Sequence, residues 1–182
     1  ADVLDGLVWN KSNTNDWTAA SLNKLLNGAY YNTQDGTSSG YCYGFISDDN
    51  IYTAEMITNN CDYTKKGIQP GYRGMIANVT WYLGASASDT DTAEGLYGSE
   101  RGTTVFGGNP TSTTGYIGLM YPSDYGYSVL SSSCARTTDL GSYDSNICAG
   151  ASWLYGKVTE WMLSPDASHS DYVYRLHSRG LG

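Results

Sequence analysis

The sequence predicts an α+β domain, with helices in the first third of the chain, antiparallel strands after it and long loops held by disulfide bonds. An apolar stripe with helical spacing, at Leu22, Leu25 and Leu26, comes early, whereas short alternating segments come later. The chain has 22 Gly among 182 residues and four Cys, a composition typical of a loop-rich, disulfide-stapled protein. At this length we expect one globular domain, residues 1–182.

The first helix is expected at about residues 18–27, within DWTAASLNKLLNGAYYN. Asp16 or Thr18 can cap its start, and Gly28 suits the position after its last turn. The apolar stripe would then face the core from one side of this helix.

A second short helix is expected in DNIYTAEMITNNC, with Asn50 as its cap. In a helix, Ile51, Ala54 and Ile57 would share one side. The β-branched residues of this segment also suit a strand, so both alternatives stay open.

Four strands are expected in the rest of the chain. The segment MIANVTWYLG alternates Val79, Trp81 and Leu83, which predicts a strand over residues 79–83. Residues 117–121 form a short apolar run that ends in a Pro-Ser-Asp turn. TEWMLSP and DYVYRLHS supply two more strands. Together these segments predict a small antiparallel sheet.

The four cysteines indicate an oxidising compartment. Four Cys allow three pairings, of which we favour the local pairs Cys42–Cys61 and Cys134–Cys148. Each bond would stabilise the fold by roughly 3 kcal/mol through loop closure. The spacing matches no zinc site, and free buried thiols are the alternative. Disulfides favour a secreted location.

The charge balance argues against several classes of partner. The net charge is −8 with only ten Lys and Arg, so we expect no nucleic acid, because phosphate binding needs clustered cations. No stretch reaches the length of a transmembrane helix, so we expect no membrane insertion by this chain. The start, ADVLDGLVWN, lacks the basic and apolar regions of a signal peptide. We therefore expect that an N-terminal export or anchoring segment is missing from this chain.

Nucleophilic catalysis has weak support. Ser164, Asp166, His169 and Asp171 are close in sequence. A Ser-His-Asp triad is assembled from distant segments, and the chain has no G-x-S-x-G motif. We therefore expect that the protein is not an enzyme.

A hydrolase that uses paired carboxylates is the minor alternative. The carboxylates available to it are Glu94, Glu100, Asp124 and Glu160. Asp89, Asp91 and Glu94 lie in SDTDTAEG, which resembles a calcium loop but lacks the EF-hand spacing and its Gly. We expect an acidic surface loop there and no metal or cofactor; a calcium site is unsupported.

Aromatic residues are the strongest remaining signal, with 17 Tyr and five Trp. The Trp residues are expected mainly in the core: Trp9, Trp17, Trp81, Trp153 and Trp161. Tyr is too abundant for the core alone, and at the surface its ring and hydroxyl suit protein or sugar contacts. Tyr with Ser, Gly and Asn is also the composition of adaptable binding surfaces.

Several motifs resemble a group of surface proteins of gut Firmicutes and Mollicutes-like bacteria that are similar to type IV pilins or pseudopilins. In order, they are WTAASLNKLLNGAYYN, IANVTWYLG, YGSERGTTVFGGNPT, IGLMYPSDYGYS, SWLYG, EWMLSP and YVYRLHSRG. They span most of the chain, from Trp17 to Gly180. In that group a prepilin-type hydrophobic helix precedes a secreted domain, and this helix is absent here.

The closing pattern, W-x-L-S-P followed by a short strand ending in Gly, resembles C-type-lectin-like domains, including those related to formylglycine-generating enzymes. The resemblance implies two early helices and a small twisted antiparallel sheet. Some such domains are variable proteins of diversity-generating retroelements, in which polar and aromatic residues near the C-terminus form a ligand surface. The ligand-binding residues implied here are Asp166, Ser168, His169, Ser170, Asp171, Tyr172, Tyr174, Arg175, His177, Ser178 and Arg179.

The sequence departs from these families at identifiable places. The calcium-dependent sugar motifs of C-type lectins are missing, since QPG at residues 69–71 only approaches one of them. The chain ends in RGLG rather than continuing into a VRP-type strand, and no catalytic cysteine pair is identifiable. These departures leave calcium-dependent sugar binding and enzyme activity unsupported.

The resemblance and the composition together predict an extracellular ligand-recognition or adhesion domain of a bacterial surface or pilus-like protein. Its partner would be a protein or glycan ligand on another cell. The alternative from a different class is a structural pilin-like subunit that self-associates in a pilus through its Tyr-rich surface.

Overall fold

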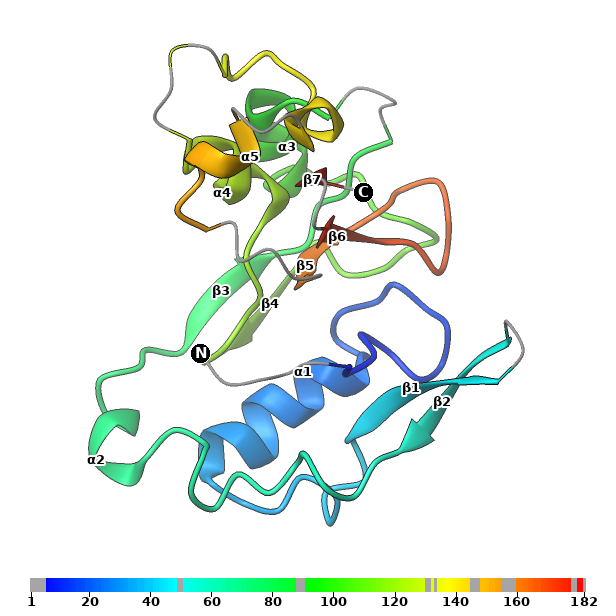
Figure 1. The fold of residues 1–182 in the computed structure, drawn as a ribbon, viewed down its shortest axis with the longest axis vertical. Helices are drawn as coiled ribbons and strands as arrows, with labels where there is room; N and C mark the ends of the chain where they lie inside the picture. Colours follow the sequence, from blue (N-terminus) through cyan, green and yellow to red (C-terminus); the bar gives the residue numbers. More distant parts are fainter. Residues whose placement is uncertain are drawn as a thin grey trace. The chain divides into compact units, whose positions relative to one another are not determined.

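The computed structural model describes residues 6–48, 51–87, 91–129, 132, 134–144, 148–154, 160–177 and 180–181. The chain divides into two compact units, one of residues 1–81 with 114–118 and the other of residues 82–113 with 119–182. The elements are short helices and small sheets, which confirms the α+β class (Figure 1). β3 (Val79–Tyr82) pairs with β4 (Ser112–Gly115), and two of the three passages of the chain between the units lie within these strands.

The first unit contains the predicted leucine-rich helix, but with different ends. α1 (Ser21–Leu25) continues directly as a π-helical segment, Leu26–Tyr30. The helix starts later than predicted because Asp16 Oδ1 accepts hydrogen bonds from Thr18 N at 2.8 Å and Thr18 Oγ1 at 2.7 Å, which closes a separate turn. Gly28 lies inside the π-helical segment, so its predicted place after the helix end is wrong.

The second early helix is wrong, because its segment forms β2 (Ile51–Met56). β2 pairs antiparallel with β1 (Tyr43–Asp48), with Phe45 opposite Ala54. The β-branched residues that left the assignment open favour the strand once a partner strand lies beside it. The predicted cap, Asn50, lies outside the described residues.

The core of the first unit forms around two tryptophans and the leucine stripe. The rings of Trp9 and Trp17 lie 5.3 Å apart, and both side chains are buried. The predicted disulfide Cys42–Cys61 is present and joins the segment before β1 to the segment after β2. A short helix, α2 (Pro70–Arg73), follows and contains no buried residue.

The second unit contains α3 (Ala93–Glu100), α4 (Pro122–Tyr127), the 3-10 helix Leu140–Asp144 and α5 (Cys148–Ala151). The strand predicted at residues 117–121 is wrong. β4 ends at Gly115, and the backbone N–H and C=O of Ile117 bond to the side chain of Asn27 instead of to a neighbouring strand. The predicted Pro-Ser-Asp turn is the first turn of α4, where Pro favours a helix start.

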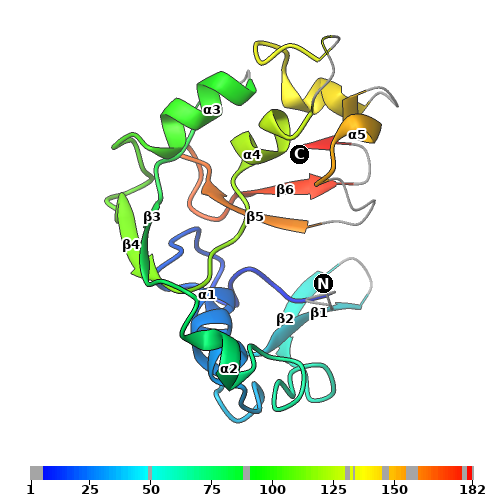
Figure 2. The ribbon, with the colours of Figure 1, turned by 90° about the vertical axis from the view of Figure 1, so that its left-hand side faces the viewer.

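The two C-terminal strands are confirmed. β5 (Glu160–Pro165) pairs antiparallel with β6 (Val173–His177), which pairs with β7 (Gly180–Leu181). In Figure 2 this sheet lies beside α4, and both strands β5 and β6 contact that helix. Met162 and Leu176 are fully buried and join a core cluster with Leu96, Tyr125 and Tyr143. This core fixes the strands that carry the C-terminal polar residues.

The predicted disulfide Cys134–Cys148 is also present, so all four cysteines are paired as expected. Two disulfides are typical of proteins from oxidising compartments. Within the described part of the chain, every helix is too short or too polar to cross a membrane.

Candidate functional site

The predicted ligand-binding residues concentrate on the turn between β5 and β6, residues 166–172. Asp166 closes this turn: its Oδ1 accepts hydrogen bonds from Ser168 N at 2.6 Å, His169 N at 2.9 Å and His169 Nδ1 at 3.2 Å. Its own N–H donates to Tyr172 O at 3.0 Å across the base of the turn. The turn is therefore held by its own hydrogen bonds as well as by the strands.

An aromatic pair stands on this turn. The ring of His169 stacks on the ring of Tyr172, with centroids 4.5 Å apart and planes 21° apart. Tyr172 is 58% exposed and His169 is also exposed. Rigid, exposed aromatic rings supply contact area to a ligand at a low cost in conformational entropy.

The remaining predicted residues divide into three groups. Ser168, Ser170 and Asp171 are exposed on the turn, and Arg175 is exposed on β6 opposite Trp161. Arg175 forms no ion pair with any described residue, so its guanidinium is open to a carboxylate or phosphate. Ser178 and Arg179 lie outside the described residues, and His177 is described only as part of β6.

Tyr174 differs from its neighbours because it packs inward. It is half-buried against the core cluster, and its Oη donates to Asp91 Oδ2 at 2.6 Å. Burial raises the pKa of Tyr174 well above its usual value, as does the hydrogen bond with Asp91. Of the predicted acidic surface loop, Asp91 is thereby tied to β6, Glu94 is exposed, and Asp89 lies outside the described residues.

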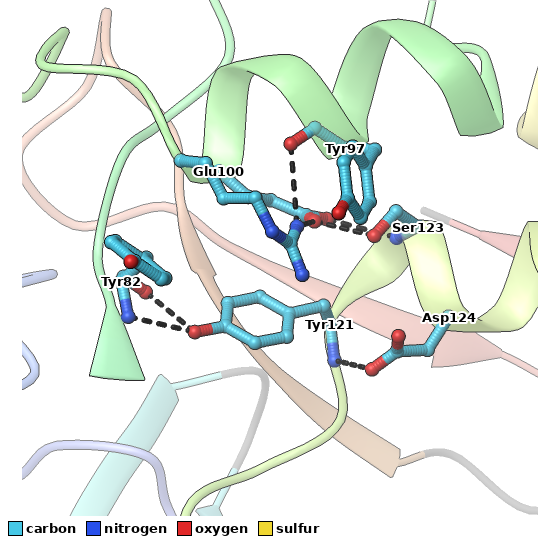
Figure 3. Close-up of polar contacts among 7 residues, drawn as sticks. Tyr82, Tyr97, Glu100, Tyr121, Ser123 and Asp124 are labelled. Atoms are coloured by element: carbon cyan, nitrogen blue, oxygen red, sulfur yellow. Dashed lines mark hydrogen bonds and ion pairs between the residues drawn. The ribbon is translucent and has the colours of Figure 1, made fainter. Parts of the chain in front are cut away.

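Two of the carboxylates considered for hydrolysis, Glu100 and Asp124, lie in a different environment, shown in Figure 3. Glu100, at the end of α3, is only 1% exposed. Its Oε1 accepts a 2.9 Å hydrogen bond from Ser123 N, its Oε2 accepts one from Ser123 Oγ, and Arg101 Nη1 lies 3.2 Å from Oε2. Asp124 Oδ2 accepts from Tyr121 N at 3.0 Å. Both carboxylates thus hold the first turn of α4.

Aromatic rings lie against Arg101, the ion-pair partner of this buried acid. The Arg101 guanidinium lies 3.7 Å from the ring centroid of Tyr97, and Tyr121 Oη bonds to Tyr82 N at 2.8 Å and Tyr82 O at 2.9 Å (Figure 3). Burial raises the pKa of Glu100 to about 7, although the hydrogen bonds from Ser123 and the charge of Arg101 oppose the shift. A carboxylate so enclosed cannot reach a substrate in solvent, so its geometry fits a structural role.

The other candidates for catalysis do not assemble. Ser164 is buried in β5, and its hydroxyl has no partner among the described residues, so it does not meet His169. Glu160 is half-buried at the start of β5, where burial raises its pKa, and Glu94 is exposed in the first turn of α3. No group of three or more His, Cys, Asp or Glu residues suited to a metal ion occurs in the described ranges.

A second surface feature was missed by sequence reasoning. A pocket of about 430 Å³ in the second unit is lined by Met120, Asp124, Tyr127, Ser128, Trp153 and Leu154. Trp153 is 77% exposed, so its predicted place in the core is wrong. The neighbouring Ser152 points inward instead, with its Oγ beside Ser128 Oγ and accepting from Leu154 N. Trp9 and Trp17 are buried as predicted, and Trp81 and Trp161 are half-buried.

No family model, curated protein or solved structure matches the chain.

Proposed function

We propose that the protein is an extracellular recognition domain whose ligand contacts the turn face, which we define as residues 168–172, together with Arg175 on β6. One observation carries the proposal: the exposed His169–Tyr172 stack stands on a turn that Asp166 closes by three hydrogen bonds. A surface ordered before binding loses little entropy when the ligand arrives. The ligand would be a protein or glycan on another cell.

The scaffold is proposed to be C-type-lectin-like and to belong to a bacterial surface or pilus-like protein. This rests on the resemblance of the sequence motifs. The antiparallel pair β5–β6 at the C-terminal end and the two local disulfides agree with it. The disulfides also favour an extracellular location.

Recognition is tested by cell binding of the purified full chain. Labelled protein would be incubated with fixed bacterial and epithelial cells and counted by flow cytometry. The proposal expects saturable binding to at least one cell type, competed by unlabelled protein. Binding that rises linearly with concentration on every cell type would contradict it.

Diversification of the turn is a separate part of the proposal and has its own test. The 3′ end of the gene would be sequenced from many cells of one population. Substitutions concentrated in codons 166–179, and matching adenines of a nearby near-repeat, are expected. Uniform variation along the gene would reject diversification and leave recognition by a fixed surface.

The second candidate function is a filament subunit, favoured by exposed apolar side chains around α2. Tyr72 is 66% exposed, and Met75 is also exposed. Large apolar side chains that are exposed together often form the contacts between subunits of an assembly. Light scattering over a range of protein concentrations separates the two functions. A constant monomer mass favours the recognition domain, whereas growth into filaments favours the subunit.

A further inference from the structure

A groove of about 400 Å³ in the first unit has a lining distinct from the turn face. Its walls include Lys24, Gly28, Tyr41, Asn78, Thr114 and Tyr116. Although the chain carries a net charge of −8, none of the described residues that line the groove is acidic. An anion in the groove would therefore contact no carboxylate among these lining residues and would lie near one ammonium, that of Lys24.

The aromatic wall of the groove is fixed in place. The ring of Tyr116 stacks on that of Tyr31, with centroids 4.3 Å apart and planes 13° apart. Tyr116 and Tyr41 both remain partly exposed. Exposed tyrosine faces suit the C–H faces of sugar rings, since the ring is apolar and its hydroxyl is polar.

A half-buried amide, that of Asn27, holds the two sides of the groove together. Asn27 Oδ1 accepts from Tyr116 N at 2.8 Å and from Ile117 N at 3.0 Å, while its Nδ2 donates to Ile117 O at 2.8 Å. These bonds fix the segment after β4 against the helix. The shape of the groove is therefore set without a ligand.

Three polar groups on the rim are open to a ligand. Lys24 forms no ion pair with any described residue, and its ammonium lies 5.3 Å from the ring centroid of Tyr41. The side chains of Asn78 and Thr114 are exposed and form no hydrogen bond with any residue that the structure describes. One ammonium, one amide and one hydroxyl can bond to sugar hydroxyls and to one carboxylate.

We propose that this groove binds an acidic oligosaccharide, a short chain of pyranose rings that carries uronate carboxylates. Tyr116 and Tyr41 would contact the ring faces, Asn78 and Thr114 the hydroxyls, and Lys24 a carboxylate. A single cation is too few for a nucleic-acid strand, which needs clustered Lys and Arg. The groove shares no lining residue with the turn face, and this proposal does not depend on the proposed function of the turn face.

Gly28 provides a sharp test because a side chain there would enter the groove. A Cβ built on Gly28 meets no atom within 4 Å apart from the backbone of its own helix and its two chain neighbours. Gly28→Leu would therefore fill the groove without a clash at its first atom, while Gly28→Ala would add only a methyl group. Both substitutions favour the helical backbone. If Gly28→Leu loses binding and Gly28→Ala does not, the cause is therefore that the leucine side chain blocks the groove.

The probe is trigalacturonate, with neutral maltotriose as the comparison, measured on the full chain by saturation-transfer NMR and titration. We expect trigalacturonate to bind with a dissociation constant on the order of 1 mM, because a shallow groove buries little area. Gly28→Leu abolishes binding, Gly28→Ala and Tyr172→Ala retain it, and Lys24→Met weakens it about threefold.

Three results would overturn the proposal. The first is that trigalacturonate at about 10 mM gives no saturation transfer. The second is that Gly28→Leu still binds it. The third is that maltotriose binds equally well and Lys24→Met has no effect on binding. Because Tyr172→Ala is expected to leave this binding unchanged, failure here is distinguishable from failure of the turn-face proposal. Thermal unfolding of each variant shows whether it has folded.

Discussion

Tyr174 Oη donates a 2.6 Å hydrogen bond to Asp91 Oδ2, which joins the second residue of β6 to the residue before the cap of α3. Asp91 Oδ1 is buried and has no hydrogen-bond partner among the described residues. Burial raises the pKa of Asp91, and the hydrogen bond from Tyr174 opposes that rise. Tyr174 therefore supports the scaffold beside the turn, while Tyr172 two residues earlier is exposed.

Tyr174→Phe is expected to lower the free energy of unfolding by about 1 kcal/mol at neutral pH, because the half-buried Asp91 carboxylate loses one donor and keeps its hydrogen bond with Ser86. The hydrogen bond favours the charged carboxylate, so the loss shrinks as the pH falls through the pKa of Asp91. Urea unfolding at neutral and acid pH measures both values. Tyr127→Phe, which removes the hydroxyl of a more exposed ring, is the matched control. An equal loss in both variants would contradict the assigned role.

Glu100 is expected to make the protein less stable as the pH rises. Its pKa is raised from 4.5 to about 7, so the folded state binds this proton more tightly than the unfolded chain does. Its contribution to the free energy of unfolding therefore falls by about 3 kcal/mol between pH 4.5 and about pH 7 and stays low above that range.

Glu100→Gln removes this dependence, because the amide keeps the shape of the side chain without the charge. Urea unfolding midpoints from about pH 5 to about pH 8 should show the variant losing less stability with rising pH than the wild type. Glu94→Gln on the exposed first turn of α3 is the control and should follow the wild type. Parallel curves for Glu100→Gln and wild type would show that Glu100 does not carry the effect.

The elements that were predictable are those whose local pattern agrees with their packing. The leucine stripe of α1, the strand around Trp81 and the alternation ending in Leu176 all point to the observed helix and strands. The disulfide pairs followed because both link cysteines that are close in sequence. Chain proximity and periodicity were sufficient in these cases.

Other features depend on partners distant in sequence. Residues 51–56 became a strand because β1 lies beside them, and residues 117–121 did not because Asn27 takes the backbone groups of Ile117. The burial of Glu100 depends on Ser123, 23 residues away. Within the turn, sequence proximity did bring Asp166, His169 and Tyr172 together, but it could not show that Tyr174 faces inward.

Asp166→Ala is expected to loosen the turn face. It removes the acceptor for Ser168 N, His169 N and His169 Nδ1, at a cost of about 1 kcal/mol for exposed bonds. Amide hydrogen exchange at residues 168 and 169 should become faster, and cell binding should weaken. Asp166→Asn keeps the Oδ1 acceptor and should stay close to the wild type. Unchanged exchange in Asp166→Ala would show that the turn is held by other contacts.

Each disulfide is expected to stabilise the folded protein. Cys42→Ala with Cys61→Ala should lower the free energy of unfolding by roughly 3 kcal/mol, and so should Cys134→Ala with Cys148→Ala. The sequence separations of 19 and 14 residues predict similar losses, because loop-closure entropy changes slowly with length. Guanidinium unfolding of both double variants measures this, and no loss in either would contradict it.

The location of the binding surface is tested most directly by comparing two tyrosines in the same cell-binding titration. Tyr172→Ala removes the exposed ring on the turn face, and Tyr72→Ala removes one of similar exposure on α2. If the turn face contacts the ligand, Tyr172→Ala weakens binding about tenfold or more, as for a central aromatic contact, while Tyr72→Ala leaves it unchanged. Equal binding by both variants, or a loss confined to Tyr72→Ala, would contradict the proposed site.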